Sequence, residues 1–397
     1  MNSVWQFSTA HSIKFGLGAR DQLPNVFDRL KLRRPVIITD STLSNLPMVR
    51  SLVDSIPAAI LFDGGEAEPT VATALEAVRA AEGGKAEAVI GIGGGSNLDV
   101  AKIVSIVLAH GGQPQDYFGF DRVPAACVPL IAMPTTAGTG SEVSHSAVLT
   151  DTDAQVKVST LSPWLRPTVA IIDPELTMTC PRNVTAESGI DALVHAIEAY
   201  TNKSFREMVG VDPQARAYEG SYPLTKLLAG EAIRLVAKSL VIACNEPNNV
   251  VAREDMAQAA MLAGMAFSNS GVGIVHALEY PVGALTHCGH GEGNGLLLPH
   301  VMRFNRDYCR QEFAEIAELM SGQSDDPNIE ARADLAISLV EQLQAAVGIR
   351  TRLSQLGMNA SDIGPVASKA FEIKRLMDIN RRPPSLADLE LILKAAL

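Results

Sequence analysis

The stretch EAVIGIGGGSNLDVAK, residues 87–102, joins a short apolar run to a helical pattern through a cluster of glycines. The apolar run predicts a buried strand, and NLDVAKIVSIVLAH predicts the helix that follows it. Glycines in such a turn let backbone N–H groups at the helix start approach a phosphate. This stretch therefore predicts an α/β fold with a ligand site at the carboxyl end of a strand.

The same alternation extends over the first half of the chain. Further strands are predicted within residues 35–40, 128–136 and 168–176, with helical patterns between them. This order predicts a parallel sheet with helices on both faces. After about Pro181 every long segment is helical by period and by Ala, Leu and Glu content. We therefore expect an α/β domain over residues 1–180, an all-α domain over 181–397, and a ligand cleft between them.

Composition narrows the class of protein. The 397 residues are 47% apolar and 19% charged, so the chain can bury a large core. The net charge is −11 and no block rich in Lys or Arg is present, which argues against nucleic acid and anionic membranes as partners. Five cysteines without a Cys-x-x-Cys pair, no signal-peptide pattern and no long apolar run predict a reduced, cytoplasmic protein.

Two more features lie at predicted strand ends. The loop PTTAGTGSEVS at 134–144 combines glycines with hydroxyl groups that suit a phosphate or a carboxamide. Asp40 ends a strand, where a carboxylate accepts hydrogen bonds from a ribose 2′-hydroxyl and repels a 2′-phosphate, which favours NAD over NADP. In the first loop Ser96 replaces the last glycine of G-x-G-x-x-G and forms a capping-box pattern with Asp99. Each feature alone also fits an ordinary turn, but together they favour a dinucleotide.

The helical half contains one aspartate and three histidines within apolar segments. Asp191 and His195 stand one helical turn apart, while His276 and His290 lie in GVGIVHALEYPVGALTHCGHGEGNG, residues 271–295. We predict a helix at His276 and a loop at His290. Burying such groups is costly unless they are paired or hold a cation, and a plain Asp–His salt bridge is the alternative. One carboxylate and three imidazoles suit Fe²⁺ or Zn²⁺.

Several motifs together resemble the iron-containing, group III alcohol dehydrogenases. The matching segments run in order from about residue 5 to the last residues: GGGSNLDVAK, PTTAGTGSEVS, RPTVAIIDPELT, GIDALVHAIEAYTN and VHALEYPVGALTHCGHGEGNGLLLPHVMRFN. The resemblance implies an N-terminal parallel-sheet dinucleotide-binding domain and a C-terminal helical metal-binding domain. It implies hydride transfer between a nicotinamide cofactor and a small alcohol, aldehyde or hydroxy acid. We also expect a homodimer or a higher homo-oligomer.

The resemblance also implies the residues of both sites. As metal ligands it implies Asp191, His195, His276 and His290. The 14-residue step between the last two fits the family pattern, whereas the rival His287 does not and is assigned to the surface or to a supporting role. The resemblance implies a further set of residues that bind the cofactor: Asp40, Gly94, Gly95, Ser96, Asp99, Thr135, Thr136, Thr139, Ser141 and Lys157. It places Lys157 near the nicotinamide ribose.

Two features depart from the family pattern. Tyr280 stands where many members carry a second histidine, and residues 203–223 resemble an extra segment. Both are similar to the branch related to hydroxyacid-oxoacid transhydrogenases, in which tightly held NAD is reduced by one acid and reoxidised by another. A lyase of the dehydroquinate-synthase type would need several Lys or Arg residues near the ligands. A silent nucleotide-binding protein would not need the complete ligand set.

Overall fold

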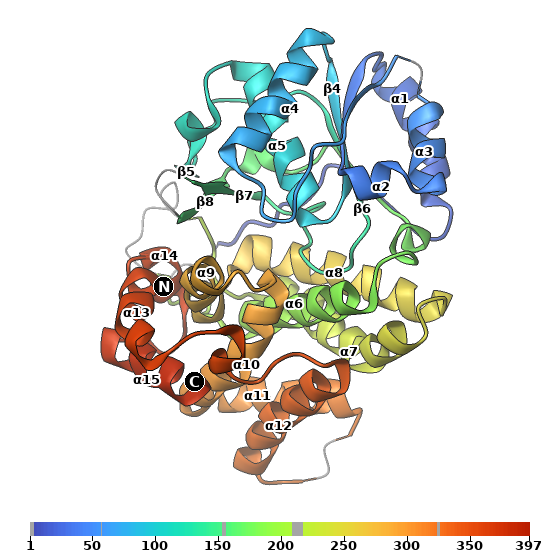
Figure 1. Ribbon diagram of the computed structural model, residues 1–397. Helices are drawn as coiled ribbons and strands as arrows, with labels where there is room; N and C mark the ends of the chain where they lie inside the picture. Colours follow the sequence, from blue (N-terminus) through green and yellow to red (C-terminus); the bar gives the residue numbers. More distant parts are fainter. Residues whose placement is uncertain (1–3, 57, 153–155, 209–216, 324–325) are drawn as a thin grey trace. The chain divides into compact units, whose positions relative to one another are not determined.

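The computed structural model describes residues 4–397 apart from 57, 153–155, 209–216 and 324–325 (Figure 1). The chain forms two compact units, Ser8–Cys180 and Pro181–Leu397, and residues 4–7 belong to the second. They do so because the Trp5 ring stacks on Tyr222 with centroids 4.4 Å apart, and the Tyr222 hydroxyl donates to the Gln6 carbonyl at 2.8 Å. The sequence pattern groups these residues with the α/β domain, since no local signal indicates so distant a partner.

The α/β unit contains a parallel six-stranded sheet in the order β1-β9-β6-β4-β2-β3. The strands are β1 (Ile13–Phe15), β2 (Pro35–Ile38), β3 (Ile60–Phe62), β4 (Ala88–Gly93), β6 (Leu130–Pro134) and β9 (Val169–Ile172). A smaller sheet contains β5 (Gly119–Phe120), β8 (Val156–Leu161) and β7 (Ser146–Asp151). The parallel sheet predicted from the sequence is confirmed.

Helices cover both faces of the large sheet because side chains alternate along its buried strands. Val36 and Val89 pack with α4 and α5, whereas the next residues, Ile37 and Ile90, pack with α1 and α3. These helices, with the short α2 between β2 and α3, are α1 (Leu23–Leu30), α2 (Ser41–Ser44), α3 (Pro47–Asp54), α4 (Val71–Gly83) and α5 (Gly95–His110).

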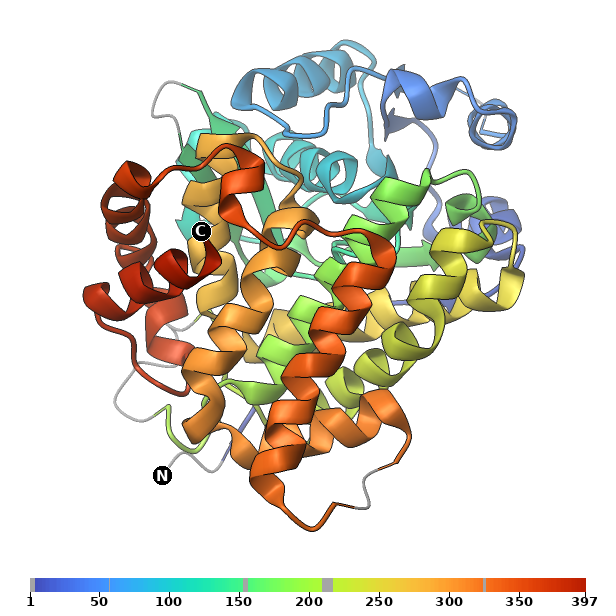
Figure 2. The same ribbon diagram turned by 60° about the horizontal axis from the view of Figure 1, so that its bottom comes forward.

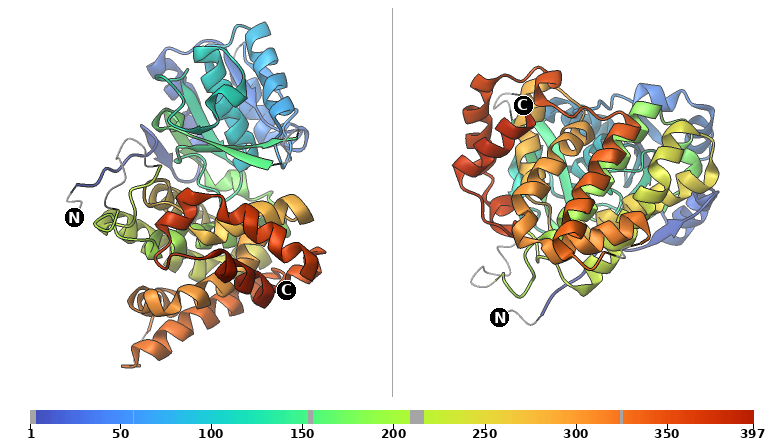
Figure 3. Two further views of the ribbon diagram at one scale, coloured as in Figure 1. Left: turned by 90° about the vertical axis from the view of Figure 1, so that its left-hand side faces the viewer. Right: turned by 90° about the horizontal axis from the view of Figure 1, so that it is seen from below.

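The second unit is helical throughout its long segments. Its helices are α6 (Arg182–Thr201), α7 (Pro223–Asn245), α8 (Val250–Ser270), α9 (Ile274–Thr286), α10 (His290–Asn305), α11 (Arg310–Ser321), α12 (Ile329–Val347), α13 (Ile363–Phe371), α14 (Lys374–Ile379) and α15 (Leu386–Ala396). Helix α6 packs against α7, α8 and α10, as Figure 2 shows, and α11 lies beside α12 (Figure 3). The central position of α6 explains why almost all of its second half is buried.

His290 and the residues that follow it form helix α10, so the prediction of a loop at His290 is wrong. Gly291 and Gly295 stand one turn apart on α10 and face α6. A Cβ atom on Gly291 would lie 2.1 Å from the Glu187 carbonyl oxygen, and one on Gly295 would lie 2.5 Å from Ile190. The glycines therefore allow two helix backbones to approach closely, which offsets their low helix propensity.

Helices α8 and α9 follow each other through a short break. Among the described residues, no single helix is long and apolar enough to cross a membrane. Helices α8 and α9 meet these criteria only when they are taken together, and the pair is bent by 105°. The side-chain amide of Asn202, the residue that follows α6, donates to the Gly271 carbonyl in this break at 2.8 Å. The break brings the first turn of α9, with His276, close to α6.

Candidate metal centre and dinucleotide site

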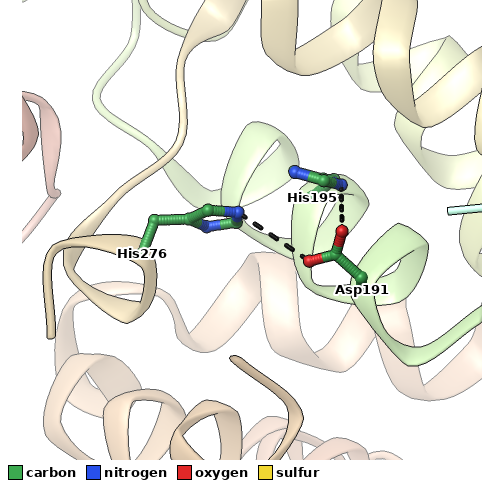
Figure 4. A group of neighbouring side chains, drawn as sticks. All are labelled: Asp191, His195 and His276. Carbon is green, nitrogen blue, oxygen red and sulfur yellow. Dashed lines mark ion pairs between the residues drawn. The ribbon is translucent and has the colours of Figure 1, made fainter. Parts of the chain in front are cut away.

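Four side chains from three helices converge within the helical unit. Asp191 and His195 share one face of α6, His276 lies in the first turn of α9, and His290 is the first residue of α10. His195 Nδ1 lies 3.7 Å from Asp191 Oδ2, and the Nε2 atoms of His276 and His290 lie 4.0 Å and 3.9 Å from Asp191 Oδ1. Figure 4 shows the rings of His195 and His276, each joined by an ion pair to a different oxygen of the Asp191 carboxylate. The structure thus brings together all four predicted ligands.

The cluster is buried on every side except at His290. Asp191, His195 and His276 are at most 5% exposed, whereas the His290 side chain is 31% exposed. Burial alone raises the pKa of the Asp191 carboxyl, but the imidazoles of His195, His290 and His276 outweigh it and hold this pKa below its ordinary value. The carboxylate therefore stays ionised at neutral pH.

Two glutamates that sequence reasoning missed contact the histidine rings from behind. Glu198 Oε2 lies 2.6 Å from His276 Nδ1, and Glu279 Oε2 lies 2.5 Å from His290 Nδ1. A carboxylate at Nδ1 favours the tautomer that carries its proton there, which leaves the Nε2 lone pair directed toward Asp191. A signal was available, because each glutamate follows a histidine by three residues, in HAIE and in HALE.

Asn294, also missed, lies at the centre of the acceptor atoms. Its Nδ2 is 2.8 Å from Asp191 Oδ1 and 3.1 Å from the Nε2 atoms of both His276 and His290. An amide nitrogen carries two hydrogens and cannot satisfy three acceptors, and its Oδ1 is buried without a hydrogen-bond partner among the described residues. An excess of acceptors around one point fits a divalent cation.

Only one of the two further residues singled out on α9 and at its end, Tyr280 and His287, contacts the four-residue cluster. His287 is exposed and ends α9 in a left-handed conformation with φ 56°, outside the cluster. Tyr280 follows His276 by one helical turn, and its ring stacks against His290 with centroids 6.2 Å apart. Of the segment 203–223, residues 209–216 lie outside the described part of the chain.

In the α/β unit, helix α5 starts without a side-chain cap. Gly94 is its N-cap, so the capping box predicted from Ser96 and Asp99 is wrong. The helix begins at Gly95, one residue before Ser96, and the Ser96 hydroxyl instead donates to the Ala67 carbonyl at 2.6 Å. The first N–H groups of α5 are therefore not taken by a capping side chain, as an anion-binding helix start requires.

The loop after β6 lies against this helix start. A Cβ atom on Gly95 would lie 2.6 Å from the Thr139 side chain, and one on Gly94 would lie 3.4 Å from that of Thr136. Thr136 and Thr139 are partly exposed, whereas Thr135 is buried. The two predicted phosphate loops are therefore adjacent, and the glycines allow their close approach.

Asp99 and Lys102, both on α5, form hydrogen bonds with serine residues of the loop that follows β6. Lys102 is fully buried, and its Nζ donates to Ser141 Oγ at 2.8 Å, Ser144 Oγ at 3.0 Å and the Ser146 carbonyl at 2.7 Å. Asp99 accepts from the Ser141 hydroxyl at 2.7 Å. Two of the predicted cofactor-binding residues, Asp99 and Ser141, are thus engaged in contacts within the protein.

Asp40 stands just beyond the carboxyl end of β2. Its Oδ1 accepts from the N–H groups of Thr42 and Leu43, both at 2.9 Å, and so caps α2. Its Oδ2 accepts from Asn97 Nδ2 at 2.8 Å, and Asn97 belongs to the first turn of α5. The carboxylate is thereby fixed next to the first phosphate loop.

Lys157 lies on β8. Its ammonium group forms an ion pair with Glu68 at 3.0 Å, and the side chain is 10% exposed. Glu68 belongs to the segment before α4, so this pair links the small sheet to the segment that leads into α4. Its relation to the other predicted cofactor-binding residues stays a prediction.

Comparison with known proteins identifies the family of this chain. Residues 10–174 match the iron-containing alcohol dehydrogenases, and residues 215–397 match the C-terminal part of the Fe-containing alcohol dehydrogenase family. The NAD-dependent methanol dehydrogenase of Bacillus methanolicus is 33% identical over 96% of this chain and 97% of its own length. Long-chain-alcohol dehydrogenase 1 of Geobacillus thermodenitrificans is 36% identical over 96% of this chain and 94% of its own length.

A solved structure shares the fold. The crystal structure of a 1,3-propanediol oxidoreductase superposes with a TM-score of 0.92 at 31% identity, over 99% of this chain and 100% of the other. This chain therefore belongs to the iron-containing alcohol dehydrogenase family and is an enzyme of that type. The resemblance found in its motifs is confirmed.

Proposed function

We propose that this chain is a metal-dependent dehydrogenase that transfers hydride between NAD and a small alcohol or aldehyde. The observation that carries the proposal is the convergence of Asp191, His195, His276 and His290, with Nε2 atoms of two rings directed at one carboxylate. The names of the relatives, an NAD-dependent methanol dehydrogenase and a long-chain-alcohol dehydrogenase, support the cofactor and the substrate class.

The four converging residues would hold Fe²⁺, or Zn²⁺ or another divalent ion, because imidazole and carboxylate ligands accept all of these. Such an ion supplies a Lewis acid that stabilises negative charge on a substrate oxygen. The ionised Asp191 offsets part of the positive charge, and Glu198 and Glu279 hold two of the rings. Burial of His195 and His276 excludes water, whereas the more exposed His290 leaves one side open.

The α/β unit, residues 8–180, would bind the dinucleotide, and residues 181–397 would bind the metal and the substrate. Backbone N–H groups at Gly94, Gly95 and Ser96 would hold the pyrophosphate at the start of α5. Asp40 would accept from the adenosine ribose and disfavour NADP.

The second loop and β8 would complete the cofactor site. Thr135, Thr136 and Thr139 would line the cofactor, with Lys157 near the nicotinamide ribose. We assign Asp99 and Ser141 to holding the loop, since each engages the other.

The test is a spectroscopic assay on protein with a known metal content. With Fe²⁺ or Zn²⁺ bound, NADH should form from NAD and at least one small primary alcohol or diol, followed at 340 nm, and NADP should be the poorer cofactor. Absence of turnover with a broad panel of alcohols, aldehydes and hydroxy acids would contradict the proposal.

One variant of the reaction is a hydroxyacid-oxoacid transhydrogenase, which Tyr280 favours because it stands beside His290 where a second histidine is usual in the family. That enzyme would hold NAD tightly and pass hydride from a hydroxy acid to a 2-oxoacid. Turnover without added NAD that requires both acids would identify it. Dependence on added NAD with an alcohol alone would identify the dehydrogenase.

A further inference from the structure

Two buried carboxylates contact the histidine rings on the side away from Asp191. Glu198 is 5% exposed and Glu279 is 0% exposed, and their Oε2 atoms lie 2.6 Å and 2.5 Å from Nδ1 of His276 and His290. Burial of a carboxylate is costly unless strong hydrogen bonds compensate it. Each glutamate is therefore tied to its ring.

The contacts pass from one helix to the next. Glu198 on α6 bonds the histidine of α9, and Glu279 on α9 bonds the histidine of α10. Glu198 also accepts from the N–H group of Val275 at 2.8 Å through its other oxygen. That N–H group lies in the first turn of α9, so one carboxylate fixes both the helix start and the ring.

We infer that Glu198 and Glu279 are positioning residues that hold both imidazoles with Nδ1 protonated and Nε2 bare toward the site. The inference rests on the proposed function, because it concerns how the protein retains the proposed metal. A ring without this partner can rotate and can carry its proton on Nε2, and either change removes a ligand atom without removing the histidine. Loss of the carboxylate therefore weakens metal binding.

The test measures metal affinity and not turnover. Protein stripped by a chelator is titrated with Zn²⁺ in competition with a chromophoric chelator. Glu279→Ala should raise the Zn²⁺ dissociation constant about 10- to 100-fold. Glu279→Gln should raise it less, because its amide oxygen can still accept from Nδ1–H.

The matched control is Glu292→Gln, two residues after His290 on the same helix. It removes the same charge, but Glu292 pairs with Arg350 at 3.3 Å and forms no hydrogen bond to the four cluster residues among the described contacts. Its Zn²⁺ affinity should stay within about twofold of the wild type, as expected for a screened surface pair. If Glu292→Gln and Glu279→Ala lose Zn²⁺ affinity equally, the loss comes from the removed charge and not from the contact with His290. That result would overturn the inference.

The outcomes separate this inference from the proposed function. Wild-type protein that takes up no Zn²⁺, or an Asp191→Asn variant that binds it as well, would defeat the metal site itself. Wild-type binding with Glu279→Ala within twofold would overturn only the positioning role. If Glu279→Ala does not fold, Co²⁺-loaded Glu279→Met decides, because methionine fills similar space but offers Nδ1–H no oxygen acceptor. A turned ring changes the ligand field, so a visible spectrum identical to that of the wild type would overturn the inference.

Discussion

The proposed metal cluster and the proposed dinucleotide loops use charged side chains in opposite ways. In the helical unit, Asp191 and its imidazoles face one another, and glutamates fix the rings from behind. In the α/β unit, buried Lys102 faces loop oxygens, and the surface offered to a ligand is largely backbone at Gly94 and Gly95. One site is therefore sensitive to side-chain chemistry, and the other to backbone shape and to the supports beneath it.

The strongest test of this contrast removes one side chain from the cluster. His276→Ala should lose bound metal and lower kcat/KM by about 10³-fold or more, since it leaves an incomplete ligand set. Metal content by mass spectrometry and NADH absorbance would measure both. His287→Ala, at an exposed position outside the cluster, should keep both properties. Full metal content in His276→Ala would remove His276 from the ligand set.

The second test concerns buried charge in the α/β unit. Burial raises the pKa of Glu142 to about 7 from an ordinary 4.5, although the charge of Lys102 opposes this. The folded state then holds more protons than the unfolded state between these values, so this group's contribution to stability is lost as pH rises from about 4.5 to 7. Relative to Glu142→Gln, the wild type should lose roughly 3 kcal/mol over this window, measured by urea unfolding. Parallel curves for the two proteins would refute the shifted pKa.

The third test adds one carbon to the backbone site. A Cβ on Gly95 would lie 2.6 Å from the Thr139 side chain, so Gly95→Ala should push the two loops apart. The NADH dissociation constant should rise about 30-fold, or about 2 kcal/mol, with metal content unchanged. Gly83→Ala is the control, because nothing lies within 4 Å of its added carbon. Equal NADH binding in both variants would show that this loop contact does not shape the cofactor site.

The smallest expected effect is at Asp40, the carboxylate proposed to meet the adenosine ribose. Asp40→Asn should preserve the cap on α2, because asparagine is as good a cap as aspartate. Asn97 can turn its amide to match, since its Oδ1 is buried without a hydrogen-bond partner among the described residues. The ratio of kcat/KM for NADP to that for NAD should rise about tenfold, or 1.4 kcal/mol. An unchanged ratio would remove Asp40 from cofactor selection.

The sequence predicts the features that depend on local pattern. Buried strands such as 35–38 and the shared face of Asp191 and His195 follow from periodicity, and ligand chemistry singles out the histidines. Features set by contacts between distant segments escape it. The glycines after His290 suggest a turn until α6 is known to lie against them. Glu198 and Glu279 each follow a histidine by three residues, but the histidines that they contact, His276 and His290, lie on other helices.

The contact between Trp5 and Tyr222 has a consequence for synthesis on the ribosome. The segment 8–180 emerges complete, with all strands of its parallel sheet, while the aromatic partner of Trp5 is still untranslated. At translation rates of about 5–20 residues per second, the residues that separate Trp5 from Tyr222 take on the order of 10–40 s to be translated. Trp5 therefore reaches its contact with Tyr222 only after every strand of the parallel sheet has been translated.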